Sequence, residues 1–258
     1  MCLYLERPVC LVVFTWGNFM KIVVTIPAYN VAKYIETVVI RVLHQNFVDK
    51  IIIVDDCSRD STYEIIRNLQ EKHNKVKAIH HKNNMGYGGA QKTLYSVALE
   101  DGADIIVLLH ADGQHLPEEL PMLLEPLKNG ECDIVVGSRA LGHMLRGGMP
   151  LYKFIGNKLL TFFENFAFGT NLTCFHDGYK ACRKNALGKI DFKAFTDDYH
   201  YDSEFLVDAI MKKLKIKEVP ITTVYNDTFS GVNVLKYSLG ILKLMLIYQF
   251  KKYKDKND

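Results

Sequence analysis

The sequence predicts an α/β fold with a mostly parallel sheet flanked by helices, and three observations lead to this prediction. Short apolar runs typical of buried strands recur at 22–26, 51–54, 76–80, 105–109 and 134–137. Segments with helical spacing of apolar residues alternate with them, at 33–45, 60–73, 88–101 and 117–129. Helix-start signals also occur where expected, as in Pro117 followed by Glu118 and Glu119. This alternation predicts βα units that share one sheet.

The bulk composition is that of one large globular domain. The chain has 258 residues, of which 48% are hydrophobic and 24% charged. A net charge of +3 is too small to indicate a nucleic-acid partner. The six cysteines show neither a CxxC pair nor metal-ligand spacing, which favours a reduced, cytoplasmic setting. No run of about 18 apolar residues predicts a transmembrane helix.

The chain divides into three parts. Residues 21–232 are expected to form the α/β domain, while residues 1–20 lack a hydrophobic period and are interpreted as a disordered or spurious extension. Residues 233–258 are interpreted as an amphipathic helix with a lysine-rich tail. Such a helix can lie on an anionic membrane surface, or it can pack on its own domain with a solvated tail. The sequence leaves both open, and peripheral contact with the cytoplasmic membrane face is one expectation.

A candidate metal site follows the strand at 105–109. Three side chains able to bind a metal, His110, Asp112 and Gln114, occupy positions i, i+2 and i+4 directly after it. Ligands in open α/β sheets collect at the carboxyl ends of strands. Oxygen and imidazole ligands suit a divalent cation such as Mn²⁺ or Mg²⁺. The alternative is a solvated turn that happens to contain one Asp.

Three further strand ends carry motifs that, with this one, point to a family. They are Pro27-Ala28-Tyr29-Asn30, Asp55-Asp56-Cys57-Ser58 and Gly137-Ser138-Arg139. Together with Asp-Gly-Gln-His-x-Pro-Glu from Asp112, they make the chain resemble an inverting family 2 glycosyltransferase of the GT-A fold, from about Lys21 to Pro220. It looks most like the branch of dolichol-phosphate mannose synthase and bacterial polyprenyl-phosphate sugar transferases.

The resemblance implies a nucleoside-diphosphate sugar, a divalent metal and a set of site residues. The matching nucleotide-sugar positions are Pro27, Tyr29, Val31, Ile53, Asp55, Gly86, Lys92, Ala111 and Arg139. Those that shape the sugar and acceptor site are Asp177, Gly178 and Tyr179. The catalytic positions are Asp112, Asp202 and Glu204, and the metal positions are His110, Asp112 and Gln114. Two of these have local alternatives, since Lys92 could be solvated and Asp202 could cap a helix.

The chain departs from the family pattern at three places. His110 replaces the usual first Asp, which removes a negative charge and shifts the preference from Mg²⁺ toward Mn²⁺, unless His110 only bonds a phosphate. Asp177 replaces a small residue of the sugar site. The segment Tyr225–Ser230 lacks the Arg and Lys with which the lipid-phosphate branch grips phosphate.

The expected reaction is transfer of a sugar to a polyprenyl or dolichyl phosphate. The first alternative is a saccharide or small-molecule hydroxyl acceptor, which would need Asp202 or Glu204 as a general base. The second is a non-catalytic sugar-nucleotide binding protein, which His110 and the missing basic pair would allow.

Overall fold

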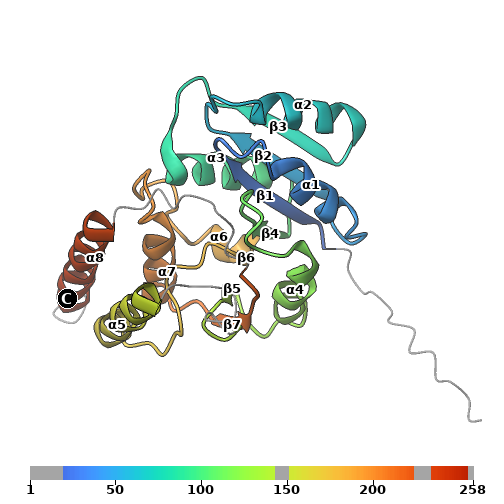
Figure 1. Cartoon of the computed structure of the whole chain (residues 1–258). Helices are drawn as coiled ribbons and strands as arrows, with labels where there is room; N and C mark the ends of the chain where they lie inside the picture. The colour runs from blue at the N-terminus through green and yellow to red at the C-terminus, as the bar shows by residue number, and fades with distance from the viewer. Residues whose placement is uncertain (1–19, 143–150, 224–233, 255–258) are drawn as a thin grey trace, which may run out of the picture.

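A seven-stranded mixed sheet forms the centre of the molecule (Figure 1). The computed structural model describes residues 20–142, 151–223 and 234–254. The N-terminal extension predicted at 1–20, apart from Met20, and the segment Tyr225–Ser230 lie outside the described residues. The strands are β1 (Ile22–Ala28), β2 (Lys50–Asp55), β3 (Val76–His80), β4 (Ile105–Leu108), β5 (Ile134–Ser138), β6 (Lys180–Arg183) and β7 (Ile216–Pro220).

The strand order is β3-β2-β1-β4-β6-β5-β7, and every neighbouring pair is parallel except those made by β6. The five strands predicted from apolar runs are confirmed within two residues. The two unpredicted strands lack such a run, because β6 reads Lys-Ala-Cys-Arg and β7 reads Ile-Lys-Glu-Val-Pro. The mostly parallel α/β sheet predicted from the sequence is therefore confirmed.

The described helices are α1 (Ile35–Leu43), α2 (Thr62–Lys72), α3 (Gly86–Glu100), a 3₁₀ turn η1 (Pro117–Glu119), α4 (Leu120–Lys128), α5 (Leu151–Phe168), α6 (Lys184–Leu187), α7 (Tyr201–Met211) and α8 (Val234–Lys254). The four helical segments predicted before residue 130 are confirmed within a few residues by α1, α2, α3 and η1 with α4. The alternative that Asp202 caps a helix is wrong, because α7 already begins at Tyr201 and His200 is its N-cap residue.

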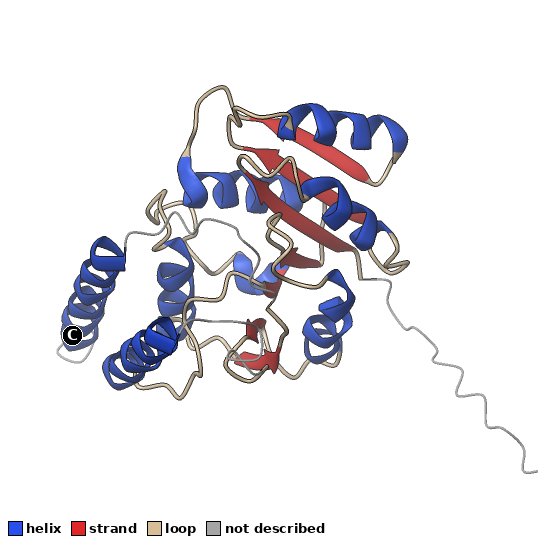
Figure 2. Ribbon diagram, in the orientation of Figure 1, coloured by secondary structure: helices blue, strands red, loops and turns tan. Residues whose placement is uncertain are grey.

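Helices flank the sheet (Figure 2), and two hydrophobic cores lie between the sheet and these helices. Because side chains alternate across a strand, Val24 and Ile26 face the core under α1, α2 and α4, while Val23 faces the other core. That second core contains Leu94 of α3 and Phe205 of α7. Both faces of the sheet are covered, which explains why its central strands are continuous apolar runs.

Helices α5 and α8 pack against each other on the outside of the second core (Figure 1). Ile241, Met245 and Tyr248 of α8 are buried, and the Tyr248 hydroxyl donates to the carbonyl of Phe168 at 3.1 Å. The helix predicted at the C-terminus therefore has one face packed on its own domain. None of the described helices is both long and apolar enough to cross a bilayer.

A buried ion pair between Glu164 and His176 joins α5 to the rest of the domain. Glu164 is 0% exposed and pairs with His176 Nε2 at 3.1 Å. Burial raises the pKa of Glu164, although His176 acts in the opposite direction. The Glu164 carboxyl therefore loses its proton at lower pH in the unfolded chain than in the folded protein. As a result, the wild-type protein loses stability as the pH rises above about 4.5 and through the raised pKa of the folded state.

Replacing Glu164 with Gln is expected to stabilise the protein at pH 7 and to have little effect at pH 4. Gln keeps an oxygen acceptor for His176 but removes the cost of burying a charge, about 1.4 kcal/mol for each unit by which the pKa is raised. Urea unfolding at both pH values measures the difference, with the exposed Glu36→Gln as control. A variant less stable than wild type at pH 7 would show that the ionised pair is net favourable.

Candidate active site

The carboxyl ends of β1, β2 and β4 and the start of α3 line an open cavity of about 250 Å³. It lies at the point where the strand order reverses between β1 and β4, the usual ligand position in open α/β sheets. Its volume suits part of an organic ligand rather than a lone ion. The lining residues are Pro27, Ala28, Tyr29, Val31, Asp56, Asn84, Gly86, Tyr87, Ala90, His110, Ala111 and Asp112.

The loop after β4 places two of the three candidate metal ligands on this wall. His110 and Asp112 line the cavity, and Asp112 Oδ1 accepts a hydrogen bond from the backbone N–H of Gln114 at 3.0 Å. Among the described residues, no cluster of three His, Cys, Asp or Glu side chains could hold a metal. One carboxylate and one imidazole fit a metal that a bound diphosphate would share, rather than a closed protein site.

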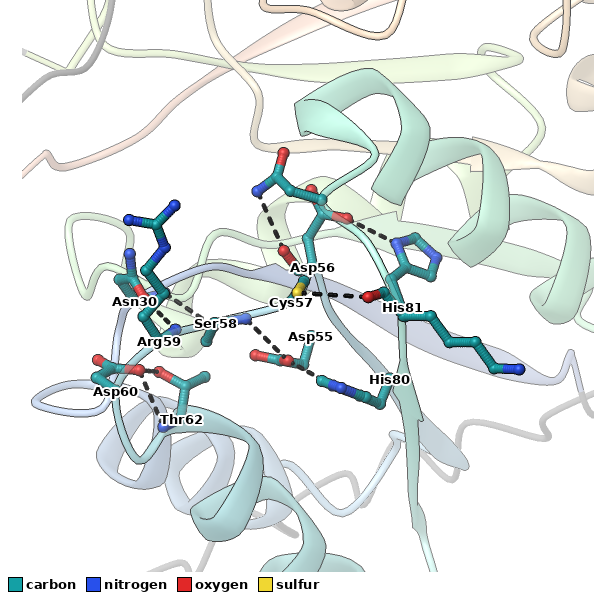
Figure 3. A network of polar contacts seen from close by, with 12 residues as sticks. Asn30, Asp55, Asp56, Cys57, Ser58, Arg59, Asp60, Thr62, His80 and His81 are labelled. Atoms are coloured by element: carbon teal, nitrogen blue, oxygen red, sulfur yellow. Dashed lines mark hydrogen bonds and ion pairs between the residues drawn. The ribbon is translucent and has the colours of Figure 1, made fainter.

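Two carboxylates at the end of β2 are each paired with a histidine at the end of β3 (Figure 3). Asp55 Oδ2 lies 2.8 Å from His80 Nδ1 and also accepts from the Ser58 N–H. Asp56 Oδ1 lies 2.7 Å from His81 Nδ1 and belongs to the cavity wall. Asp55 is fully buried, and its Oδ1 has no hydrogen-bond partner among the described residues.

The prediction from sequence missed both histidines. His80 is the last residue of the run predicted as a strand at 76–80 and His81 follows it directly, and β3 pairs with β2 so that Asp55 is opposite His80. The sequence does show two acids at the end of one strand and two histidines at the end of the next. That pattern predicts the two ion pairs only if the two strands are known to be neighbours in the sheet. Tyr63 stacks near the His80 ring with a centroid distance of 4.3 Å, which fixes that ring further.

A buried polar network lies behind the cavity and contains Asp202. Its Oδ1 accepts from Gln91 Nε2 at 3.0 Å and from the Lys180 ammonium, and its Oδ2 accepts from the Tyr87 hydroxyl at 2.7 Å. Burial acts to raise the pKa of Asp202, but the Lys180 ammonium and these hydrogen bonds outweigh it and lower the pKa. The Tyr87 oxygen in turn lies 3.2 Å from Nε2 of His110. The Tyr87 side chain thus connects Asp202 to His110 in the candidate metal loop.

Four residues of the predicted nucleotide-sugar set do not line the cavity: Ile53, Asp55, Lys92 and Arg139. The Ile53 side chain lies in the core with Val24 and Ile26, so it does not reach the cavity. The Lys92 ammonium binds the Asp197 carboxylate at 2.7 Å, so it is neither a solvated lysine nor a residue of the cavity wall. Arg139 pairs through its guanidinium and its backbone N–H with the fully buried Asp177.

The residues predicted for the acceptor site are also engaged with the protein. The carboxylate that replaces the family's small residue, Asp177, holds Arg139. The Tyr179 hydroxyl donates to the carbonyl of Leu116 at 3.3 Å. Glu204 accepts from the backbone N–H and the hydroxyl of Thr196, at 2.7 and 2.9 Å.

Comparison with known proteins identifies the class. Residues 23–191 match the model of glycosyl transferase family 2. The chain is 39% identical to UDP-N-acetylglucosamine–dolichyl-phosphate N-acetylglucosaminyltransferase of Methanococcus voltae, over 81% of this chain and 89% of that one. It is 30% identical to polyprenol monophosphomannose synthase of Mycolicibacterium smegmatis, over 78% and 77% of the two chains. The chain therefore belongs to glycosyl transferase family 2, as the resemblance predicts.

The fold is shared with a solved enzyme of low sequence identity. Glucosyl-3-phosphoglycerate synthase of Mycobacterium tuberculosis, in complex with UDP, superposes with a TM-score of 0.66 at 19% identity, over 89% of this chain and 80% of that one. Another structure of that synthase contains Mn²⁺, UDP and phosphoglyceric acid, with a TM-score of 0.67 at 18% identity, over 89% and 78% of the chains. The GT-A fold expected from the sequence is confirmed.

Proposed function

We propose that this glycosyltransferase moves a sugar, with inversion and with a divalent metal, from a nucleoside-diphosphate sugar to a polyprenyl or dolichyl phosphate. The names of the Methanococcus and Mycolicibacterium relatives support a lipid-phosphate acceptor. The observation that carries the proposal is chemical: among the described residues, both acids expected to act as a base for a hydroxyl acceptor are already bound by protein donors.

A hydroxyl acceptor needs a carboxylate that can take its proton in the transition state. Asp202 accepts hydrogen bonds from Lys180, Gln91 and Tyr87, and its lowered pKa makes it a weak base. Glu204 is held by Thr196 and is absent from the cavity wall. A phosphate monoester has a second pKa near ~6, so it reaches the site mostly ionised and needs no such base. The geometry therefore favours a phosphate nucleophile.

The donor half of the reaction would use the cavity wall. Asp112 and His110 would hold the metal, which would supply Lewis-acid stabilisation of the departing diphosphate. Asp55 is fully buried and is not part of this wall, but its Oδ1 has no partner among the described residues and would accept a hydrogen bond from an N–H of a base or from a ribose hydroxyl. His80 and Ser58 would keep this carboxylate oriented.

The test is a panel of UDP- and GDP-sugars with Mn²⁺ and either a short polyprenyl phosphate or the matching polyprenol, read by mass spectrometry. We expect a glycosyl-phosphate product from the phosphate acceptor alone. Product from a saccharide or polyprenol hydroxyl would support the hydroxyl-acceptor alternative. Tight nucleotide-sugar binding with neither transfer nor hydrolysis across the panel would support the non-catalytic alternative.

An exposed apolar face on α5 and α8 supports a membrane-borne acceptor. The outer side chains of α5 recur at helical spacing and are 49–84% exposed: Ile155, Leu159, Phe162, Phe163 and Phe166. Adjacent α8 exposes Leu239, Leu242, Leu246 and Ile247 by 43–67%. Large exposed apolar side chains on two helices that contact each other indicate a site of association. Two helices with exposed apolar side chains suit a bilayer surface, which is where a polyprenyl phosphate resides.

Replacing Phe162 and Phe166 together with Gln is expected to weaken binding to anionic phospholipid vesicles by about tenfold or more. Burying one Phe side chain in an apolar phase is worth about 1.5–3 kcal/mol, and about 1.4 kcal/mol corresponds to tenfold. Vesicle co-sedimentation measures this, with the half-exposed Met122→Gln on α4 as a control outside the face. Vesicle binding that is unchanged in this variant would contradict the assignment of the face to the membrane.

A further inference from the structure

The His110 ring is held at its Nε2 edge by two neighbours. The Tyr87 hydroxyl oxygen lies 3.2 Å from Nε2, with the two rings stacked at a centroid distance of 5.6 Å. On the same edge, a Cβ built on Gly178 would lie 1.9 Å from Nε2. The backbone at Gly178 therefore closes that side of the ring, and Nε2 has no room for a metal ion or a phosphate oxygen.

The direction of the hydrogen bond to Nε2 follows from the group behind Tyr87. A tyrosine hydroxyl has one proton, and here it donates that proton to Asp202 Oδ2 at 2.7 Å. Asp202 cannot donate back, because the adjacent Lys180 ammonium keeps the carboxylate ionised. The Tyr87 oxygen must then accept, and Nε2 must carry the hydrogen.

Resting on the proposed function, we propose that Tyr87 and Asp202 are positioning residues that fix His110 in the Nε2–H tautomer and leave Nδ1 as its metal-binding nitrogen. Nδ1 has no hydrogen bond to any described residue. Ligating histidines commonly donate their second N–H to a carboxylate, directly or through another group, which fixes the tautomer and strengthens the ligand. Here Tyr87 transmits that role from Asp202, and Lys180 keeps Asp202 charged.

The proposal explains how an imidazole can occupy a position where the family usually has Asp. A carboxylate presents a charged oxygen in any orientation, whereas a neutral imidazole presents one lone pair whose place depends on the tautomer. Without Tyr87, the two tautomers would be close in energy, and part of the protein would present an N–H to the metal. The network thus compensates for the loss of a negative charge at position 110, because it keeps Nδ1 of His110 unprotonated and ready to bind the metal.

The first test observes the tautomer without any metal, sugar or acceptor. Long-range ¹H–¹⁵N NMR of histidine-labelled protein, at about pH 8 where an ordinary imidazole is neutral, distinguishes protonated from unprotonated ring nitrogens. The His110 signals are assigned by their loss in His110→Gln. We expect the Nε2–H form in the wild type. The Nδ1–H form, or a mixture of the two, would overturn the proposal, and this outcome needs no variant of the network.

The second test measures Mn²⁺ affinity by the EPR signal of free Mn²⁺, with Mn²⁺ alone and with pyrophosphate in place of the nucleotide diphosphate. Tyr87→Phe is expected to weaken Mn²⁺ binding about 10- to 100-fold, the usual effect of losing a group that supports a metal ligand. The matched control is Tyr199→Phe, because Tyr199 stacks on Tyr87 at 5.4 Å but lies outside the network. Equal affinity in wild type and Tyr87→Phe, at equal melting temperature, would refute the positioning role.

A third readout identifies the ligand atom. Electron spin echo modulation of bound Mn²⁺ should show a ¹⁴N coupling in the wild type that disappears in His110→Gln. Mn²⁺ bound without such a coupling would mean that His110 is not a ligand and would overturn the proposal. These measurements are independent of turnover, so an inactive protein with the expected tautomer and coupling would refute the proposed function alone.

Discussion

Replacing Asp112 with Asn is expected to lower sugar transfer by at least about 100-fold, with Mn²⁺ binding weakened in parallel. Asp112 is the one carboxylate of the loop after β4 that reaches the cavity wall, and its Oδ1 is oriented by the Gln114 N–H. Asn preserves that hydrogen bond but removes the negative charge that a divalent cation requires. Losing the metal would remove several kcal/mol of stabilisation from the departing diphosphate.

The measurement is initial rates by mass spectrometry at saturating Mn²⁺, with Asp191→Asn as a matched control on an exposed carboxylate far from the cavity wall. Near wild-type turnover of Asp112→Asn would contradict the metal assignment. His110→Asp offers a complementary variant, expected to keep activity and to move the metal preference from Mn²⁺ toward Mg²⁺. If both metals support the two forms equally, the residue at 110 does not contact the metal.

Breaking the Lys180–Asp202 pair is expected to destabilise the folded protein by about 3–5 kcal/mol, the usual cost of leaving one buried charge without its partner. Lys180 is 1% exposed and Asp202 is 7% exposed. The Lys180 ammonium also lies 4.7 Å from the centre of the Phe205 ring. Lys180→Gln would leave an uncompensated carboxylate, and Asp202→Asn would leave an uncompensated ammonium.

The double variant Lys180→Gln, Asp202→Asn provides the control, because it removes both charges and keeps groups that can hydrogen-bond. We expect it to regain at least half of the stability lost in either single variant. Urea unfolding at pH 7 measures all three. The lowered pKa of Asp202 also predicts how stability depends on pH. The contribution of the pair to the free energy of unfolding is complete above about pH 3.8, the ordinary pKa of Asp, and is lost as the pH falls through the lowered pKa of the folded state. Single variants that cost less than about 1 kcal/mol would contradict the pairing.

Catalysis offers a second reading of the Asp202→Asn variant. If Asp202 acts by holding Tyr87, its loss should reduce turnover on polyprenyl phosphate only moderately, and Glu204→Gln should do the same. A loss above about 10³-fold from either change, with nucleotide-sugar binding preserved, would instead indicate a catalytic base and a hydroxyl acceptor.

Local pattern was sufficient for most of the fold and for the location of the cavity. Continuous apolar runs marked β1, β2, β3, β4 and β5, because strands covered on both faces carry apolar side chains in both directions. The polar residues after β1 and β4 could be expected to meet, because parallel strands end at one edge of the sheet. Tyr29, His110 and Asp112 do line one cavity.

The sequence by itself thus determined the class of fold, the family and the loop that reaches the cavity, whereas only the tertiary structure decided which polar groups face ligand and which face each other. Asp177 binds Arg139, Asp202 binds Lys180, and Asp55 pairs with His80. Each pair joins segments that lie 22 to 38 residues apart. The physical reason is that apolar periodicity is a local property of the backbone, while the partner of a buried charge depends on strand order and register.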